Sequence, residues 1–157
     1  QHEPAMVALP IDHPLALRQR RGKPLPIQIT DLEGEPMILV RRPGAPGLYA
    51  NLLALCAEQG VRPRVVAEVA RMLTNLNLVA AGTGISVVPS SMLGVHRHAI
   101  AYRPLVDGGR LDVPLTLVYR ADDNMGPTAT FTTLLRTLAD EPHPAVATEP
   151  PQKKAAR

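Results

Sequence analysis

Short apolar runs alternate with segments of helical periodicity along this chain. Apolar runs predict buried strands at residues 6–11, 37–40, 65–69, 85–88, 99–105 and 113–120. Apolar residues spaced three and four apart predict helices from Gly47 to Gly60 and from Arg71 to Ala81. A last helix is expected after residues 122–124, with Phe131, Leu134, Leu135 and Leu138 on its inner face. Strands that alternate with helices indicate an α/β fold with largely parallel pairing.

The segment from residue 72 to 95 contains no charged side chain. It is too polar to cross a membrane, which requires about 20 predominantly apolar residues, because it includes asparagines, serines and glycines. Its Gly82-Thr83-Gly84 sequence is a poor phosphate loop, since Val87 stands where a dinucleotide-binding motif needs a third glycine. These glycines also lead from a helix into a strand, which is the wrong direction for phosphate binding. We therefore expect a core helix, a glycine turn and a buried strand.

Composition and charge fit a globular domain of 157 residues, or two small lobes. The net charge of +3 falls short of the dense basic face of a nucleic-acid-binding protein. The basic segment RQRRGKPLP, which begins at Arg18, is predicted to be a solvated loop, with a nucleic-acid patch as the alternative. The single Cys56 is expected in the core of a cytoplasmic protein. The chain has no initiator Met and no signal peptide, so we expect a piece of a longer protein.

Residue patterns for catalysis or metal binding are weak in this sequence. The sequence contains no Gly-x-Ser-x-Gly motif, and no pair of carboxylates lies on a predicted cleft. Neither pattern of an active site is therefore present. His96 and His98 are the one close histidine pair, and we expect them at a solvated strand edge rather than in a metal site. The sequence thus predicts neither an enzyme, nor a metal centre, nor a bound cofactor.

Several motifs resemble the effector-binding region of LysR-type transcriptional regulators. They are ALPIDHPLA, ITDLEGEPMILVRR, GLYANLLALCAEQGVRPRVVAEV, LNLVAAGTGISVVPSSM, YRPL and LTLVYR, in this order across about residues 5–140. The resemblance implies a two-lobed fold like that of type II periplasmic binding proteins, which senses a small molecule, often an organic or aromatic carboxylate. DNA would be bound by an N-terminal winged helix that lies outside this chain. It further implies a homodimer or homotetramer, and no membrane.

The resemblance also suggests how the chain is divided. Residues 1–40 would form part of the first lobe, 41–103 a nearly complete second lobe, and 104–140 the return to the first lobe. The composition of residues 141–157 predicts a disordered tail. An incomplete first lobe would leave apolar strand faces uncovered, and we expect them to associate with another chain.

Candidate effector contacts follow from the rule that open α/β sheets bind ligands beyond the carboxyl ends of their strands. Arg41 and Arg42 come directly after the strand 37–40 and could pair with a carboxylate, unless they are merely solvated. Ser90 and Ser91 follow the strand 85–88, and their alternative role is to cap a short helix.

The glycine turn is a further candidate. The resemblance implies that Gly82, Thr83 and Gly84 lie near the cleft between the lobes, where Thr83 offers a hydroxyl; the alternative is a plain turn. The alternative for the whole protein is a periplasmic solute-binding protein of the same architecture, which would carry an export signal. An enzyme on this fold would need a reactive cysteine or an acid–base pair in the cleft.

Overall fold

The computed structural model describes residues 3–41, 47–106, 108–111, 117–118, 120 and 125–140. The chain forms two compact units, Gln1–Leu115 and Thr116–Arg157. The strands all lie in the first unit, and the second contains one helix, α4 (Gly126–Asp140), among the described residues.

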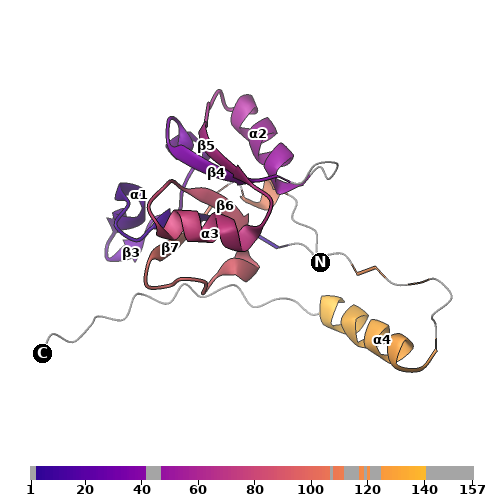
Figure 1. Cartoon of the computed structure of the whole chain (residues 1–157). Helices are drawn as coiled ribbons and strands as arrows, with labels where there is room; N and C mark the ends of the chain where they lie inside the picture. Colours follow the sequence, from indigo (N-terminus) through magenta and orange to yellow (C-terminus); the bar gives the residue numbers. More distant parts are fainter. Residues whose placement is uncertain are drawn as a thin grey trace, which may run out of the picture. The chain divides into compact units, whose positions relative to one another are not determined.

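A three-stranded antiparallel sheet forms the centre of the first unit (Figure 1). Its middle strand, β1 (Ala5–Pro10), pairs with β6 (Ser86–Pro89) on one side and with β7 (Ile100–Pro104) on the other. All six residues of β1 are buried, so the alanines and aliphatic residues of AMVALP cover both faces of the strand. The apolar run at residues 6–11 therefore correctly predicted a buried strand.

A parallel pair of strands packs beside this sheet. β4 (Pro36–Val40) pairs with β5 (Arg64–Val69), and the helix α2 (Leu48–Glu58) connects them. A parallel bridge between Met37 and Ile85 joins β4 to the segment that enters β6, and Ile38 N–H donates to Ile85 O at 2.8 Å. The expectation of largely parallel pairing is wrong for the described strands, because β1 is hydrogen-bonded to antiparallel neighbours on both of its edges.

The helix α3 (Met72–Ala80) buries Asn75, Leu76 and Val79 against the sheets. Shorter elements complete the first unit: α1 (Pro14–Leu17), the hairpin strands β2 (Gln19–Arg20) and β3 (Lys23–Pro24), and the 3-10 turns η1 (Ile29–Leu32), η2 (Ser90–Met92) and η3 (Gly108–Arg110). The hairpin forms within the solvated loop predicted at RQRRGKPLP, and its residues 18–23 are all exposed.

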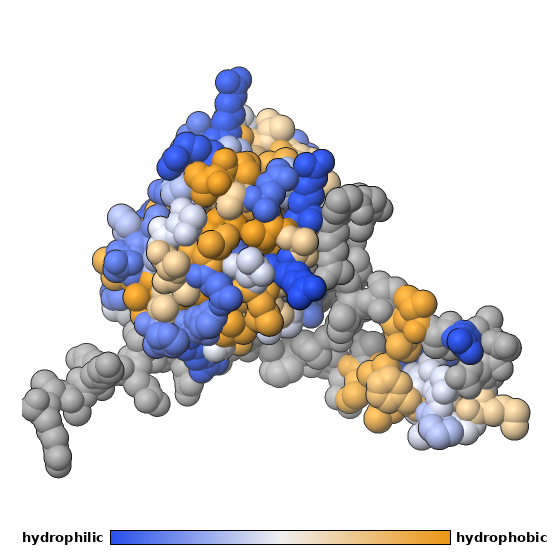
Figure 2. Space-filling view, in the orientation of Figure 1, coloured by the Kyte–Doolittle hydropathy of each residue, from blue (hydrophilic) through white to orange (hydrophobic). Residues whose placement is uncertain are grey.

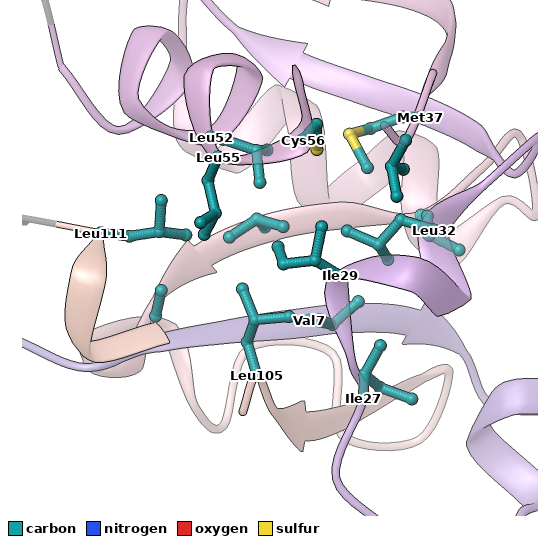
Figure 3. Packing of buried hydrophobic residues seen from close by; sticks show 14 of the residues in the cluster. Val7, Ile27, Ile29, Leu32, Met37, Leu52, Leu55, Cys56, Leu105 and Leu111 are labelled. Carbon is teal, nitrogen blue, oxygen red and sulfur yellow. The ribbon is translucent and has the colours of Figure 1, made fainter. Parts of the chain in front are cut away.

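The larger hydrophobic core lies between α2, η1 and the sheet (Figure 3). Its residues come from distant parts of the sequence and include Val7, Ile29, Met37, Leu52, Leu55, Cys56 and Leu105. Cys56 is 1% exposed, as its place on the apolar face of α2 predicted. Burial raises the pKa of its thiol, and the Glu33 carboxylate adds to this effect. Cys56 is therefore a core side chain and not a nucleophile.

The strand order corrects the predicted division into lobes. Residues 1–40 were assigned to the first lobe and 41–103 to the second, yet β1 lies between β6 and β7 in one sheet. The boundaries at 40/41 and 103/104 also fall inside one compact unit. The backbone of β1 needs hydrogen-bond partners on both edges, and strands from the far side of the predicted boundary provide them. The assignment of residues 116–140 to another lobe stays a prediction.

The second unit exposes the face of α4 that was predicted to point inward. Phe131, Leu134 and Leu138 are 56%, 53% and 46% exposed, and Figure 2 shows apolar patches on this helix beside polar ones. The helix itself was correctly predicted. The predicted caps at residues 122–124 and the tail at 141–157 lie outside the described residues, as does most of the strand predicted at 113–120.

Asp31 links the base of the β2–β3 hairpin to η1. It accepts hydrogen bonds from Gln28 N–H at 2.8 Å and from Arg18 Nη1 at 2.7 Å. Burial by itself would raise the pKa of this carboxyl, but the hydrogen bonds and the Arg18 charge outweigh burial and lower it. A carboxyl with a lowered pKa stabilises the folded state above its unfolded pKa, and this contribution is lost as the pH falls through the folded value.

We expect Asp31→Asn to reduce the free energy of unfolding by about 1 kcal/mol at neutral pH. The difference from the wild type should shrink as the pH falls below about 4 toward the lowered pKa of the native carboxyl. Urea denaturation of both proteins at neutral pH and at acid pH measures this. A difference that stayed constant with pH would contradict the assigned role of the charge.

Candidate functional site

Arg41 directly follows the carboxyl end of β4, an apolar strand whose three central residues are buried. Its backbone N–H donates to Val69 O at 2.9 Å, which continues the β4–β5 pairing by one residue. Its guanidinium Nη1 lies 3.2 Å from Glu68 Oε2, and Tyr49 Oη donates to Glu68 Oε1 at 3.3 Å. The Arg41 and Glu68 side chains are 60% and 41% exposed, so water screens their attraction. Together they form a polar cluster, Arg41–Tyr49–Glu68, that a ligand can reach from solvent.

The amino end of α2 belongs to the same region, because Tyr49 in its first turn contacts Glu68 on β5. Gly47 is the N-cap in an extended conformation and has no side chain to accept a hydrogen bond from the first turn. The positive end of the helix dipole thus lies near Arg41, and both favour an anion. Arg42, the second arginine predicted here, lies outside the described residues.

The turn of Gly82, Thr83 and Gly84 has a structural explanation. Gly82 has φ of +77° at the end of α3, which favours glycine. A Cβ on Gly84 would overlap Pro36 O, so the backbones of this turn and of β4 can approach only because Gly84 has no side chain. Thr83 is exposed, and its backbone N–H donates to Leu78 O at 3.0 Å.

The predicted contact residues therefore do not form one site. The glycine turn packs against Pro36 at the beginning of β4, whereas Arg41 follows the end of that strand. Five residues of extended chain separate the two positions by about 16 Å. The structure does not bring Gly82, Thr83 and Gly84 together with Arg41.

Ser90 and Ser91 lie toward the same side of the sheet as Arg41, because β6 runs parallel to β4 through the Met37–Ile85 bridge. They begin η2, but Pro89 is the N-cap and no side chain caps the turn, so the capping role predicted for them is wrong. Their backbone N–H groups donate instead to Pro4 O at 3.0 Å and to Glu3 Oε2 at 3.1 Å. Their hydroxyls remain candidates for ligand contacts.

Two residues of the polar cluster were missed by the sequence analysis. Glu68 is the only charged residue within the apolar run VVAEV. This isolated charge was the one feature of the sequence that could have indicated a functional role for Glu68. Tyr49 was overlooked because an aromatic residue in a helix usually packs on the core. It does so here as well, but its hydroxyl also reaches Glu68. Neither residue could be paired with Arg41 before the register of β4 and β5 was known.

The histidine pair lies in a turn before β7 and not on a strand edge. His96 has φ of +50°, and its Nε2 lies 2.7 Å from Asn77 Oδ1. The His96 and His98 rings meet edge to face with centroids 6.1 Å apart. Among the described residues, no three acidic, histidine or cysteine side chains cluster as metal ligands. Within the same part of the chain, none of the helices has the length and apolarity needed to span a membrane.

Comparison with known proteins identifies the family. The model of the LysR substrate binding domain matches residues 1–141. The chain belongs to this family. It is 36% identical over 139 residues to a probable cat1 operon transcriptional activator of Acinetobacter lwoffii, which covers 88% of this chain and 43% of the relative. It is 33% identical to the HTH-type transcriptional regulator AlsR of Bacillus subtilis, over 79% of this chain and 39% of the relative. The chain spans less than half the length of these relatives.

Solved structures of LysR-family proteins share the fold. The effector binding domain of BenM, solved with its effector benzoate, superposes with a TM-score of 0.61 at 29% identity and covers 71% of this chain and 49% of that chain. The LysR family regulator CbnR superposes with a TM-score of 0.71 at 23% identity, over 85% of this chain and 44% of that chain. These matches confirm the α/β, periplasmic-binding-protein-like fold that the resemblance implied. The named relatives are transcriptional regulators, not enzymes.

Proposed function

We propose that this chain is part of the effector-sensing domain of a LysR-type transcriptional regulator. The observation that supports this function best is the polar cluster Arg41–Tyr49–Glu68, which stands at the carboxyl ends of parallel strands beside the amino end of α2. Ligands of open α/β sheets bind at such an edge. Family membership and the effector-bound structure of BenM agree with a sensing role.

The proposed ligand is a small anion, and an organic or aromatic carboxylate fits best. Arg41 would pair with the carboxylate, for which it must leave Glu68 or bind both groups. The serine hydroxyls of Ser90 and Ser91 lie toward the same side of the sheet and could accept or donate further hydrogen bonds. Such a ligand can shift the domain between two conformations only to the extent that it binds one of them more tightly than the other.

The other proposals concern the whole regulator. DNA would be bound by a winged helix elsewhere in the protein, and two or four copies would assemble in the cytoplasm. The relatives named above are HTH-type or operon regulators, which favours a sensor over a periplasmic solute-binding protein. We propose no catalytic role, because the one cysteine is buried in the core and has a raised pKa.

The proposal predicts that Arg41→Gln weakens the binding of benzoate to this chain by about tenfold, since it removes a charge-assisted hydrogen bond. Titration followed by NMR, with the amide resonances of β4 and β5 as reporters, measures the affinity. Arg64→Gln is the matched control, because Arg64 is exposed on β5 and forms no ion pair with a described residue. The control should bind benzoate like the wild type. Equal affinity of Arg41→Gln and the wild type would refute the placement of the site.

A further inference from the structure

The basic hairpin, residues 18–25, carries a concentration of positive charge that the proposed sensing role does not use. β2 and β3 pair Gln19 with Pro24 and Arg20 with Lys23. Leu25 N–H closes the base by donating to Arg18 O at 3.1 Å. Arg21 and Gly22 form the two-residue tip, and both have positive φ, +53° and +74°. The hairpin lies at the edge of the first unit next to α1 (Figure 1).

Two features of the basic hairpin oppose its stability. Arg20 and Lys23 stand directly opposite each other on paired strands, where like charges repel. Arg21 adopts the left-handed conformation, which strains most residues other than glycine and asparagine. Residues that break local rules without a stabilising gain often serve binding. The tip therefore combines a high positive charge with a poor fit to the turn.

No carboxylate neutralises the tip within the part of the chain that the structure describes. Arg18 at the base pairs with Asp31 at 2.7 Å, but Arg20, Arg21 and Lys23 are exposed and have no acidic partner there. Three cations thus face solvent within four consecutive positions. Two of them are guanidinium groups, whose planar donors match phosphate oxygens.

We propose that the tip of the basic hairpin binds the phosphate backbone of duplex DNA, which adds sequence-independent contacts to those of the DNA-binding domain. This inference rests on the proposed function, because a DNA-binding regulator would hold the hairpin and duplex DNA in one complex. Duplex DNA carries about one negative charge per 1.7 Å of its axis, and this density offsets the repulsion among three adjacent cations. Such contacts position a protein on DNA without reading bases.

The test measures binding of this chain to a short fluorescent duplex of arbitrary sequence by anisotropy, at several salt concentrations. The variant R20Q/R21Q/K23Q should bind more weakly, with a salt dependence shallower by about 0.9 in log K per log salt for each lost phosphate contact, hence by about 2 to 3. The control R62Q/R64Q/R71Q removes the same charge from exposed arginines elsewhere and should bind like the wild type. If both variants lost the same affinity for the duplex, net charge alone would explain the effect and the proposal would be overturned. The proposal would also be overturned if the wild type did not bind the duplex.

A single substitution separates binding from folding. Arg21→Gly relieves the strained φ, so its midpoint of thermal unfolding should rise while its salt dependence becomes shallower by about 0.9. A variant that binds the duplex like the wild type would refute a role for Arg21. Poly-glutamate and unlabelled duplex of equal charge are compared as competitors of the labelled duplex. If poly-glutamate competes more strongly, the hairpin is a binding surface for acidic proteins, and the assignment to DNA is overturned. Benzoate binding is measured separately, so failure here leaves the sensing proposal intact.

Discussion

Gly84→Ala should lower the free energy of unfolding by about 3 kcal/mol, the largest effect expected of a single methyl group in this chain. The added Cβ would overlap Pro36 O, which belongs to the backbone and cannot rotate away. The same oxygen accepts a hydrogen bond from Ile85 N–H at 2.7 Å, one of the links between β4 and the segment entering β6. Relief of the overlap therefore requires separation of the parallel pair from the central sheet. Urea denaturation followed by circular dichroism measures the loss.

Two other glycines are controls for this prediction. Gly82→Ala should cost only about 1 kcal/mol, because Gly82 has φ of +77° but open space around its Cα. Gly109→Ala should change stability by less than about 0.5 kcal/mol, since Gly109 has neither a positive φ nor a close neighbour. A Gly84→Ala variant as stable as Gly109→Ala would mean that the turn does not press against β4.

Ser86→Ala should destabilise the protein by about 2 to 3 kcal/mol, because it removes the centre of a buried hydrogen-bond chain. Asn75 Nδ2 donates to Ser86 Oγ at 2.7 Å, and Ser86 Oγ donates to Ile38 O at 2.8 Å. Asn75 and Ser86 are 0% and 1% exposed, so water cannot replace the lost partner without entering the core. Asn75 Oδ1 has no hydrogen-bond partner within the described residues. The Asn75 amide therefore depends on the hydrogen bond that its Nδ2 donates to Ser86.

A double-mutant cycle tests this explanation. Asn75→Leu alone should cost about 1 kcal/mol, because Ser86 keeps its bond to Ile38 O. The double variant Asn75→Leu/Ser86→Ala removes both polar groups, so it should be more stable than Ser86→Ala alone. The unfolding free energies of the wild type, both single variants and the double variant are compared. If the loss in the double variant equals the sum of the two single losses, the two side chains do not interact.

Local patterns in the sequence were sufficient to locate most of the elements. The uniform apolar run at 37–40 required a buried strand, and the spacing of Leu52, Leu55 and Cys56 required one buried helical face. Both conclusions depend only on neighbouring residues, whose periodicity reflects which side faces the core. The family motifs added the type of fold, which the comparisons confirmed. The charge-free segment 72–95 is correctly explained as helix, glycine turn and buried strand, followed by η2.

Other properties depended on contacts between residues far apart in the sequence. The position of β1 between β6 and β7 follows from backbone pairing across about 80 to 100 residues, which no local pattern encodes. The same holds for Arg41 with Glu68, which the parallel register of β4 and β5 brings together over 27 positions. The close approach of Gly84 to Pro36 likewise depends on packing between β4 and the turn. The sequence by itself determined most of the strands, helices and turns, and the family to which they belong, because these depend on local periodicity and motifs. Only the tertiary structure decided which side chains share an edge of the sheet, because that depends on strand register and packing.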